Sequence, residues 1–321
     1  MPRSARVVLA VTLGAAIAAT AALGTSSEFS EWTPATRVEA APGTDPSFNG
    51  PDLDGCPFIS RDGRTFYMAS NRPGGLGGLD IWVSTRSGEN APWGAPLNVG
   101  APVNSAANDF CPTIDPNGLD FYFVSNRAGG CGGADIYSTR VYSGVGFVQP
   151  QNLGCAVNSA ADEASPFPLQ QRSGQLLYFS SARPGGFSPD PPGATAGDSD
   201  LYLSSARGGA FGAAELVAGV NTASEDGQPS LRRDGLELFF FSNRPGTLGL
   251  ADIYAATRAR TSDSWSTPLN LGSNVNSAAG AETRPALSRD GTTLYFGSTR
   301  PGGEGSTDHY LTTRERLTGG G

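Results

Sequence analysis

The sequence predicts an all-β fold, a five-bladed β-propeller whose blades are four-stranded antiparallel sheets and whose last blade is closed by the N-terminal strand. One pattern recurs five times at intervals of roughly 55 residues, and repeats of this length are typical of propellers. The chain also holds 44 Gly and 24 Pro among 321 residues, so turns are frequent and long helices have little room.

Each repeat predicts four strands, as the first one illustrates. A short strand at Pro57–Ser60 meets a tight turn at Asp62-Gly63, which is a strong hairpin signal. A second strand follows at Thr65–Ser70, and a Gly-rich loop leads to a third at Leu79–Thr85. The fourth is expected within Trp93–Val99. Such a small sheet cannot bury both faces alone, so the copies are expected to stack around an axis.

The N-terminus supplies the strand that the fifth repeat lacks. The fourth-strand pattern occurs in repeats one to four, whereas after Arg314 the chain reads only ERLTGGG. A shortened version, WTPATRVEA, begins at Trp32 and is predicted to complete the last blade, which leaves no open sheet edge. The predicted blades lie near 52–101, 106–157, 160–221, 224–275, and 279–314 together with 32–40.

The first residues are typical of a secretory signal. Arg3 and Arg6 precede the apolar run Val7–Leu23, and the small residue Gly24 marks a cleavage site. A retained anchor helix is the alternative, although the run is short for a bilayer span and rich in Ala and Gly. We therefore expect a signal peptide at 1–24 and a single propeller domain at 25–321, exported to the periplasm or out of the cell.

Composition excludes several kinds of chemistry. The formal charge is −8 and the chain contains no Lys, which excludes Schiff-base chemistry on lysine and offers no basic stripe for nucleic acid. His309 is the only histidine, so a zinc site of several histidines is impossible. It occupies a strand position held by Ile in other repeats, and we expect an ordinary strand residue there. No cofactor and no metal are expected.

The repeats also resemble a known family. The Pro-x-hydrophobic-Ser-x-Asp-Gly turn, the Ser-Asn-Arg-Pro-Gly-Gly loop and the Asp-Ile-Tyr/Trp strand are similar to the WD-repeat-like propeller units of the TolB type. The resemblance covers residues 52 to 314 and implies propeller blades. It also implies six blades and a separate α/β domain for TolB itself, whereas five repeats account for this sequence.

Three charged positions recur in all five repeats. An acid precedes the first strand at Asp54, Asp109, Glu163, Asp226 and Glu282. An arginine follows the second strand at Arg72, Arg127, Arg183, Arg244 and Arg300. An aspartate opens the third strand at Asp80, Asp135, Asp200, Asp252 and Asp308.

Two interpretations of these positions stay open. In the functional one, the first two sets form a ring of carboxylates and guanidiniums around the channel mouth that binds a cation, a sugar or a peptide. In the structural one, each Arg bridges an Asp of its own blade and an acid on a linker, which fixes blade against blade. The bidentate geometry of Arg with carboxylates suits the second task.

Four cysteines suggest two disulfides in an exported protein, with three possible connectivities. We favour Cys131–Cys155 and Cys56–Cys111, because the first two lie at one end of the second blade and the others at matching positions of adjacent blades. Free buried thiols are the alternative. The glycines of the loop Gly74–Asp80 are expected to serve a tight left-handed turn. The insertion of blade three, Gly185–Asp200, is interpreted as a tolerated surface insertion, with a loop that determines specificity as the alternative.

The lack of a unique catalytic group favours a monomeric, non-catalytic binding or scaffold propeller that presents its loop face to an envelope protein or a glycan. The alternative is a glycan-acting hydrolase with carboxylates at the propeller mouth, since two carboxylates are enough for glycoside hydrolysis. A structural envelope protein without a small ligand is the third possibility.

Overall fold

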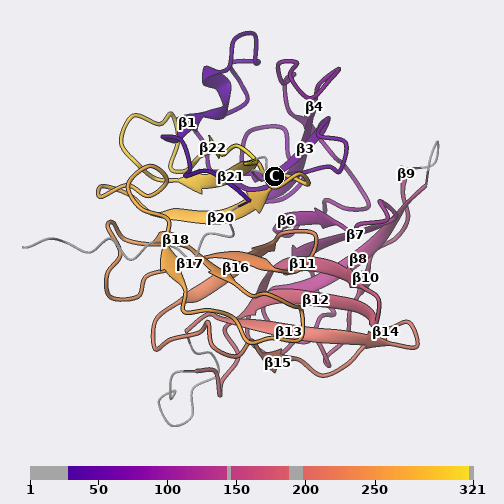
Figure 1. Ribbon diagram of the computed structural model, residues 1–321. Helices are drawn as coiled ribbons and strands as arrows, with labels where there is room; N and C mark the ends of the chain where they lie inside the picture. The colour runs from indigo at the N-terminus through magenta and orange to yellow at the C-terminus, as the bar shows by residue number, and fades with distance from the viewer. Residues whose placement is uncertain (1–27, 143–145, 188–197, 318–321) are drawn as a thin grey trace, which may run out of the picture.

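The computed structural model describes residues 28–142, 146–187 and 198–317, and it consists of five antiparallel sheets around one axis (Figure 1). The five-bladed propeller is thus confirmed. The predicted signal segment, 1–24, and most of the blade-three insertion lie outside the described residues. Within the described ranges the one helical element is a 3-10 turn, Val38–Ala40, and no helix is long and apolar enough to cross a membrane.

Blade one shows how each sheet is built. Its strands run outward from the axis in the order β2 (Asp54–Ile59), β3 (Thr65–Ser70), β4 (Asp80–Thr85) and β5 (Leu97–Asn98). The first three match the prediction closely, whereas the fourth is only two residues long. The two prolines that precede it, at 92 and 96, have no N–H for a ladder, which confines pairing to a short stretch at the outer edge.

The other blades follow the same order. Blade two contains β6 (Asp109–Ile114), β7 (Asp120–Ser125), β8 (Asp135–Tyr142) and β10 (Gln151–Asn152), with β9 (Gly146–Phe147) also on β8. Blade three contains β11 (Glu163–Gln171), β12 (Gly174–Ser181) and β13 (Asp200–Arg207), with β14 (Ala210–Phe211) and β15 (Glu215–Leu216) both on β13. Blade four contains β16 (Asp226–Leu231), β17 (Glu237–Ser242), β18 (Asp252–Thr257) and β19 (Leu269–Asn270).

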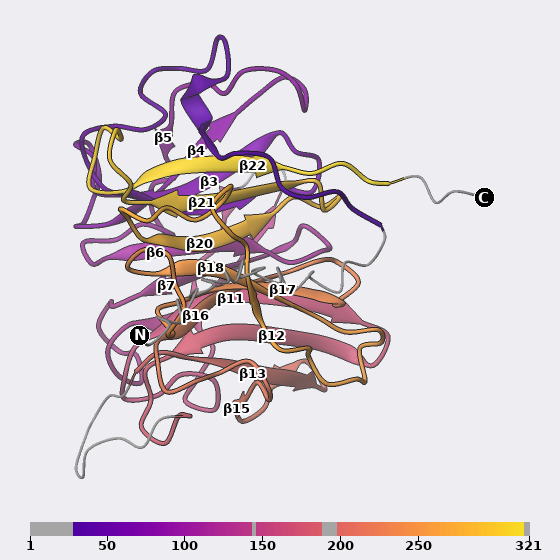
Figure 2. The same ribbon diagram turned by 60° about the vertical axis from the view of Figure 1, so that its left-hand side comes forward.

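Blade five is closed by the N-terminal segment, as predicted. Its strands are β20 (Glu282–Leu287), β21 (Thr293–Ser298), β22 (Asp308–Thr313) and β1 (Thr36–Arg37). β1 pairs antiparallel with β22, and Figure 2 shows the indigo N-terminal segment beside the yellow β22. The ring is therefore closed by segments from the two ends of the described chain, with β1 as the outer strand of this blade.

A second contact reinforces the closure. Phe29 forms an antiparallel bridge with Arg316, outside the predicted strand. Arg314 lies over the rings of Phe29 and Trp32, 3.9 and 4.4 Å from their centroids, and donates two hydrogen bonds of 2.8 and 2.7 Å to the buried carboxylate of Glu237 in blade four. The N-terminal segment thus also fastens blade five to blade four.

The hydrophobic core lies between the blades. Four clusters of buried side chains each span two neighbouring blades, and a fifth spans blades one to three. Between blades one and two, for example, Ile81 packs with Val103 of the linker and with Phe121, Phe123 and Tyr137. Full burial of one such side chain contributes about 1.5–3 kcal/mol to the free energy of folding. Because this burial occurs between blades, each blade depends on its neighbours for stability.

The Gly-rich loops have a second reason for their glycines besides the turn. Gly74 adopts the left-handed conformation expected, with φ +97°. A Cβ on Gly77 would lie 1.8 Å from the carbonyl oxygen of Ala107, and one on Gly305 would lie 1.8 Å from that of Asp52. Each loop thus packs directly on the linker that leads into the next blade.

Candidate functional site

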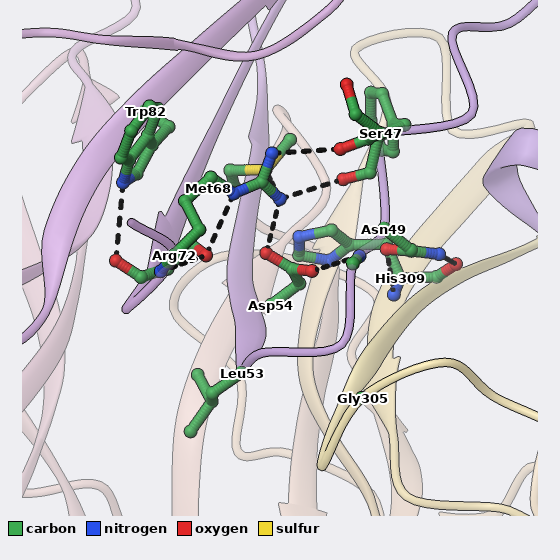
Figure 3. Close-up of polar contacts among 12 residues, drawn as sticks. Ser47, Asn49, Leu53, Asp54, Met68, Arg72, Trp82, Gly305 and His309 are labelled. Atoms are coloured by element: carbon green, nitrogen blue, oxygen red, sulfur yellow. Dashed lines mark hydrogen bonds and ion pairs between the residues drawn. The ribbon is translucent and has the colours of Figure 1, made fainter. Parts of the chain in front are cut away.

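The acid and the arginine of the first two repeated sets form an ion pair in every blade. In blade one the guanidinium of Arg72 contacts the Asp54 carboxylate at 2.5 Å and donates to the carbonyl oxygens of Ser47 and Phe48, at 2.9 and 3.0 Å (Figure 3). The corresponding pairs are Asp109–Arg127 at 2.6 Å, Glu163–Arg183 at 3.1 Å, Asp226–Arg244 at 2.5 Å and Glu282–Arg300 at 3.1 Å.

These ten residues face the protein interior. The acid side chains have no exposed surface, and the arginine side chains are 11 to 17% exposed. Arg127 illustrates the packing, because it also lies 5.2 Å from the ring centroids of Phe123 and Tyr137. The pairs fasten each linker to the blade it enters. Ligand binding at this ring stays a prediction.

The third repeated aspartate does not join this pair, which differs from the bridge expected. Asp80 instead accepts hydrogen bonds from the N–H groups of Leu76 and Gly77 in its own Gly-rich loop and from the Asn98 amide. Asp135 and Asp252 each contact an N–H of the corresponding loop and the corresponding Asn. This aspartate therefore shapes the loop that packs on the next linker.

A repeated asparagine, missed by the sequence reasoning, holds the other side of each linker. Asn104 accepts from the N–H of Ile81 and donates to its carbonyl oxygen, both at 2.8 Å. The set is Asn49, Asn104, Asn158, Asn221 and Asn276. Its position five residues before the acid in four repeats, and six before it in the fifth, was the available signal. The linker is thus held to the blade it leaves by Asn and to the blade it enters by Arg.

His309 is a buried strand residue rather than part of a reactive site. Its backbone pairs with Asn49 (Figure 3). Its ring contacts Phe48 and Phe66 edge to face. Neither ring nitrogen has a partner within the described residues. Burial, helped by the charges of Arg72 and Arg284, lowers the pKa of His309 to about 3, so the ring is neutral near pH 7.

The inner strands narrow the axial channel. Each bulges at one residue of positive φ, and these five residues line a small cavity of about 50 Å³ on the axis: Cys56, Cys111, Ser165, Gln228 and Arg284. A disulfide joins Cys56 to Cys111 across adjacent blades, and a second joins Cys131 to Cys155, which is the predicted pairing. Burial lowers the pKa of Arg284.

A much larger cavity of about 680 Å³ opens where the inner strands end. We call it the hairpin cavity, since the turns between the first and second strands of the blades surround it. Its size lies in the range of ligand sites for small molecules. Its lining includes these polar and aromatic residues: Phe58, Ser60, Arg61, Asp62, Tyr67, Thr113, Asp115, Asn117, Phe167, Gln170, Arg233, Ser288 and Arg289.

Two carboxylates line the hairpin cavity. Asp62 is exposed, and hydrogen bonds from the Ser60 hydroxyl at 2.6 Å and from the N–H of Arg64 lower its pKa. Asp115 is only 5% exposed, and one of its oxygens accepts from the N–H groups of Leu119 and Asp120 at 2.9 and 3.1 Å. These two residues come from neighbouring blades, at hairpins whose sequences differ.

Aromatic rings form part of the same wall. Phe58 and Tyr67 lie with their ring centroids 6.5 Å apart, and Phe167 is contributed by blade three. Burial raises the pKa of Tyr67, so its hydroxyl is protonated at neutral pH. Apolar rings combined with a few polar groups are typical of sites for small organic ligands. No group of three metal-ligating side chains occurs in the parts of the chain that the structure describes.

The hairpin cavity lies at the opposite end of the inner strands from the ten repeated residues. The positions that recur in all five repeats lie at the linker face, and the candidate site was predicted there. The signal for the cavity was a position at which the hairpin sequences of the repeats differ. The hairpin that reads Ser-Arg-Asp-Gly in blades one and five reads Asp-Pro-Asn-Gly in blade two, which introduces Asp115.

Comparison with solved structures places the chain among five-bladed propellers. The catalytic domain of a GH62 α-L-arabinofuranosidase from Coprinopsis cinerea matches with a TM-score of 0.57 and 14% identity, over 90% of this chain and 98% of that one. A thermostable family-43 glycoside hydrolase matches with a TM-score of 0.55 and 13% identity, over 86% and 92%. An α-L-arabinofuranosidase from Lactobacillus brevis matches with a TM-score of 0.51 and 14% identity, over 88% and 94%.

No protein-family model matches the chain, and no curated protein matches it in sequence. A putative TolB from Agrobacterium tumefaciens aligns with a TM-score of only 0.47 and 13% identity, over 90% of this chain and 99% of that one, which supports nothing finer than a propeller. At such identities the likenesses establish the fold alone.

The structural comparison nevertheless corrects one prediction. The chain was expected to be a non-catalytic binding propeller, whereas the propellers it is similar to are glycoside hydrolases. The prediction rested on the repetition and on the lack of a unique catalytic group, and it overlooked the hairpins that differ between blades.

Replacing Arg127 by Ala is expected to lower the free energy of unfolding by about 3 kcal/mol, because Asp109 would stay buried without its cation. Denaturation in urea measures the loss. Arg140→Ala in the same blade removes a largely exposed pair with Asp120 and should cost less than about 1 kcal/mol. Equal losses in the two variants would contradict the assignment of Arg127 to the linker contact.

Replacing His309 by Ile, the residue at this position in three other blades, should reduce the sensitivity of stability to acid. The folded-state pKa lies below the usual 6.5, so the unfolded state binds more protons as the pH falls below 6.5. The wild-type chain should therefore lose about 1.5 kcal/mol more than the variant between pH 6.5 and 5. Parallel curves of unfolding free energy against pH would contradict the burial of a neutral imidazole.

Proposed function

We propose that the chain is an exported glycan-acting hydrolase whose substrate binds in the hairpin cavity. The observation that carries the proposal is an open cavity of about 680 Å³ on the propeller axis whose wall combines aromatic rings with two carboxylates. Glycoside hydrolysis needs two carboxyl groups and no cofactor. The likeness to arabinofuranosidase and family-43 propellers supports the same choice.

The two carboxylates receive different roles. The Ser60 hydroxyl and the N–H of Arg64 stabilise the charged form of Asp62, which suits it to act as the base or nucleophile at neutral pH. Asp115 is the other carboxyl group of the described lining, and the remaining role, proton donation, is assigned to it by elimination. The donor protonates the departing glycosidic oxygen, and water supplies the hydroxyl group and restores the proton.

The substrate is held by the remaining wall in this proposal. The rings of Phe58, Tyr67 and Phe167 offer apolar faces for the C–H surface of a sugar, and the amides of Asn117 and Gln170 offer donors and acceptors for its hydroxyls. Two disulfides are typical of an oxidising compartment, which agrees with a periplasmic or extracellular enzyme that meets its glycan outside the cytoplasm.

Asp62→Asn and Asp115→Asn are each expected to lower hydrolysis of the best substrate from a panel of glycans by at least ~100-fold, because general acid–base catalysis contributes that much. The matched control is Asp290→Asn. Asp290 has the same hairpin position as Asp62 and the same 2.6 Å contact with a serine hydroxyl, but it does not line the cavity. Its variant should keep wild-type activity.

Thermal melting of all three variants separates loss of activity from loss of folding. Equal activity of the Asp62 and Asp290 variants would place the chemistry elsewhere. A complete absence of hydrolysis across α- and β-linked glycans by the full, disulfide-bonded chain would overturn the proposal.

A further inference from the structure

Three arginines from three different blades converge on the hairpin cavity. Arg61, Arg233 and Arg289 occupy the same position of the hairpin in blades one, four and five, and each lines the cavity. All three side chains belong to exposed residues. The two remaining hairpins carry Pro116, which also lines the cavity, and Arg172, which does not.

These three guanidiniums are uncommitted. In the described chain none of them donates a hydrogen bond, forms an ion pair or stacks on a ring. The neighbour of Arg233 shows the contrast, because Arg232 pairs with both Asp234 and Glu28 at 2.8 Å. A single solvent-exposed arginine without a partner is common on a protein surface. Three directed at one cavity, in a chain of net charge −8, form a local concentration of positive charge.

The charge balance of the cavity follows from its lining. Three guanidiniums stand against two carboxylates, Asp62 and Asp115, and the lining holds no other ionisable acid or base apart from Tyr67. Farther along the axis Arg284 lines the narrow cavity, and its Nε has no partner. The two cavities together are therefore lined by four guanidiniums and two carboxylates, although the protein as a whole is acidic.

Guanidinium groups bind planar carboxylates and sulfate or phosphate oxygens through paired N–H donors, which a neutral sugar cannot match. We propose that the hairpin cavity takes an acidic saccharide, whose anionic group is bound by Arg61, Arg233 and Arg289 while its ring faces Asp62 and Asp115. The inference rests on the proposed function and narrows its substrate class from glycans in general to glycans that carry uronate or sulfate groups.

Calorimetric titration of the full, disulfide-bonded chain tests the inference without any readout of catalysis. The probes are oligogalacturonate and oligoglucuronate, the same oligosaccharides after reduction of their carboxylates to alcohols, and a sulfated neutral oligosaccharide. Uronate or sulfated probes should bind at least ~10-fold more tightly than the reduced ones, as charge-assisted hydrogen bonds warrant. Added salt should weaken the binding.

Variants assign the effect to the three residues. Arg61→Ala, Arg233→Ala and Arg289→Ala should each weaken binding of the acidic probe by roughly 5- to 10-fold and leave thermal melting unchanged, since these exposed side chains make no hydrogen bond, ion pair or ring contact with the described residues. Arg260→Ala removes an exposed arginine that does not line the cavity and should leave binding unchanged.

Each outcome decides between the possibilities. Binding of uronates but not of the sulfated probe identifies a carboxylate ligand, and the reverse identifies a sulfate ester. Equal binding of the reduced probes, equal affinity of the three variants and the wild type, or no binding by any acidic probe would overturn the inference. Hydrolysis of neutral glycans without a preference for acidic ones would overturn it and leave the proposed function standing. Binding of acidic probes without hydrolysis of any glycan would do the opposite.

Discussion

The fold depends on how each linker is held between two blades. A single four-stranded sheet cannot bury its own faces, so each of its two faces must pack against a neighbouring blade. The linker that joins two blades is fixed at its start by an asparagine to the blade it leaves and at its end by a buried ion pair to the blade it enters. The ion pair is shielded from water. Removing one partner would therefore leave an uncompensated buried charge, so each linker contact needs both partners.

The same constraint separates structure from function along each inner strand. The linker end of the strand repeats almost unchanged in five blades, because the acid, the arginine and the Gly-rich loop must all meet there. The hairpin end contacts no linker and is free to differ, as Asp115 and Pro116 of blade two show beside Ser60 and Arg61 of blade one. A site for one asymmetric substrate needs such differences, and the structure provides them at the hairpin cavity.

The repeats made most of the fold predictable. Strand order, blade number, closure by the N-terminal strand and both disulfides follow from aligning the five copies, since each copy corroborates the others. The two-residue length of β5 and the contact between Phe29 and Arg316 were not foreseen, because they depend on packing at the outer edge. The candidate site was missed for a physical reason. Alignment emphasises positions that are identical, and Asp62 and Asp115 become neighbours of one cavity only when the blades curl around the axis.

Arginine has two roles in this protein, one in the fold and one at the cavity. With no lysine in the chain, the same side chain serves as a buried partner of carboxylates and as an exposed group at the cavity. Burial decides between the roles: Arg127 has its charge satisfied by Asp109 and the linker carbonyls, whereas the hairpin that carries Arg289 turns its own acid, Asp290, toward Ser288 and Thr292. Because Asp290, the acid of this hairpin, is hydrogen-bonded within the hairpin, the guanidinium of Arg289 keeps its N–H donors for an external anion. A cavity that is positive in an acidic protein thus follows from how the turn satisfies its own carboxylate.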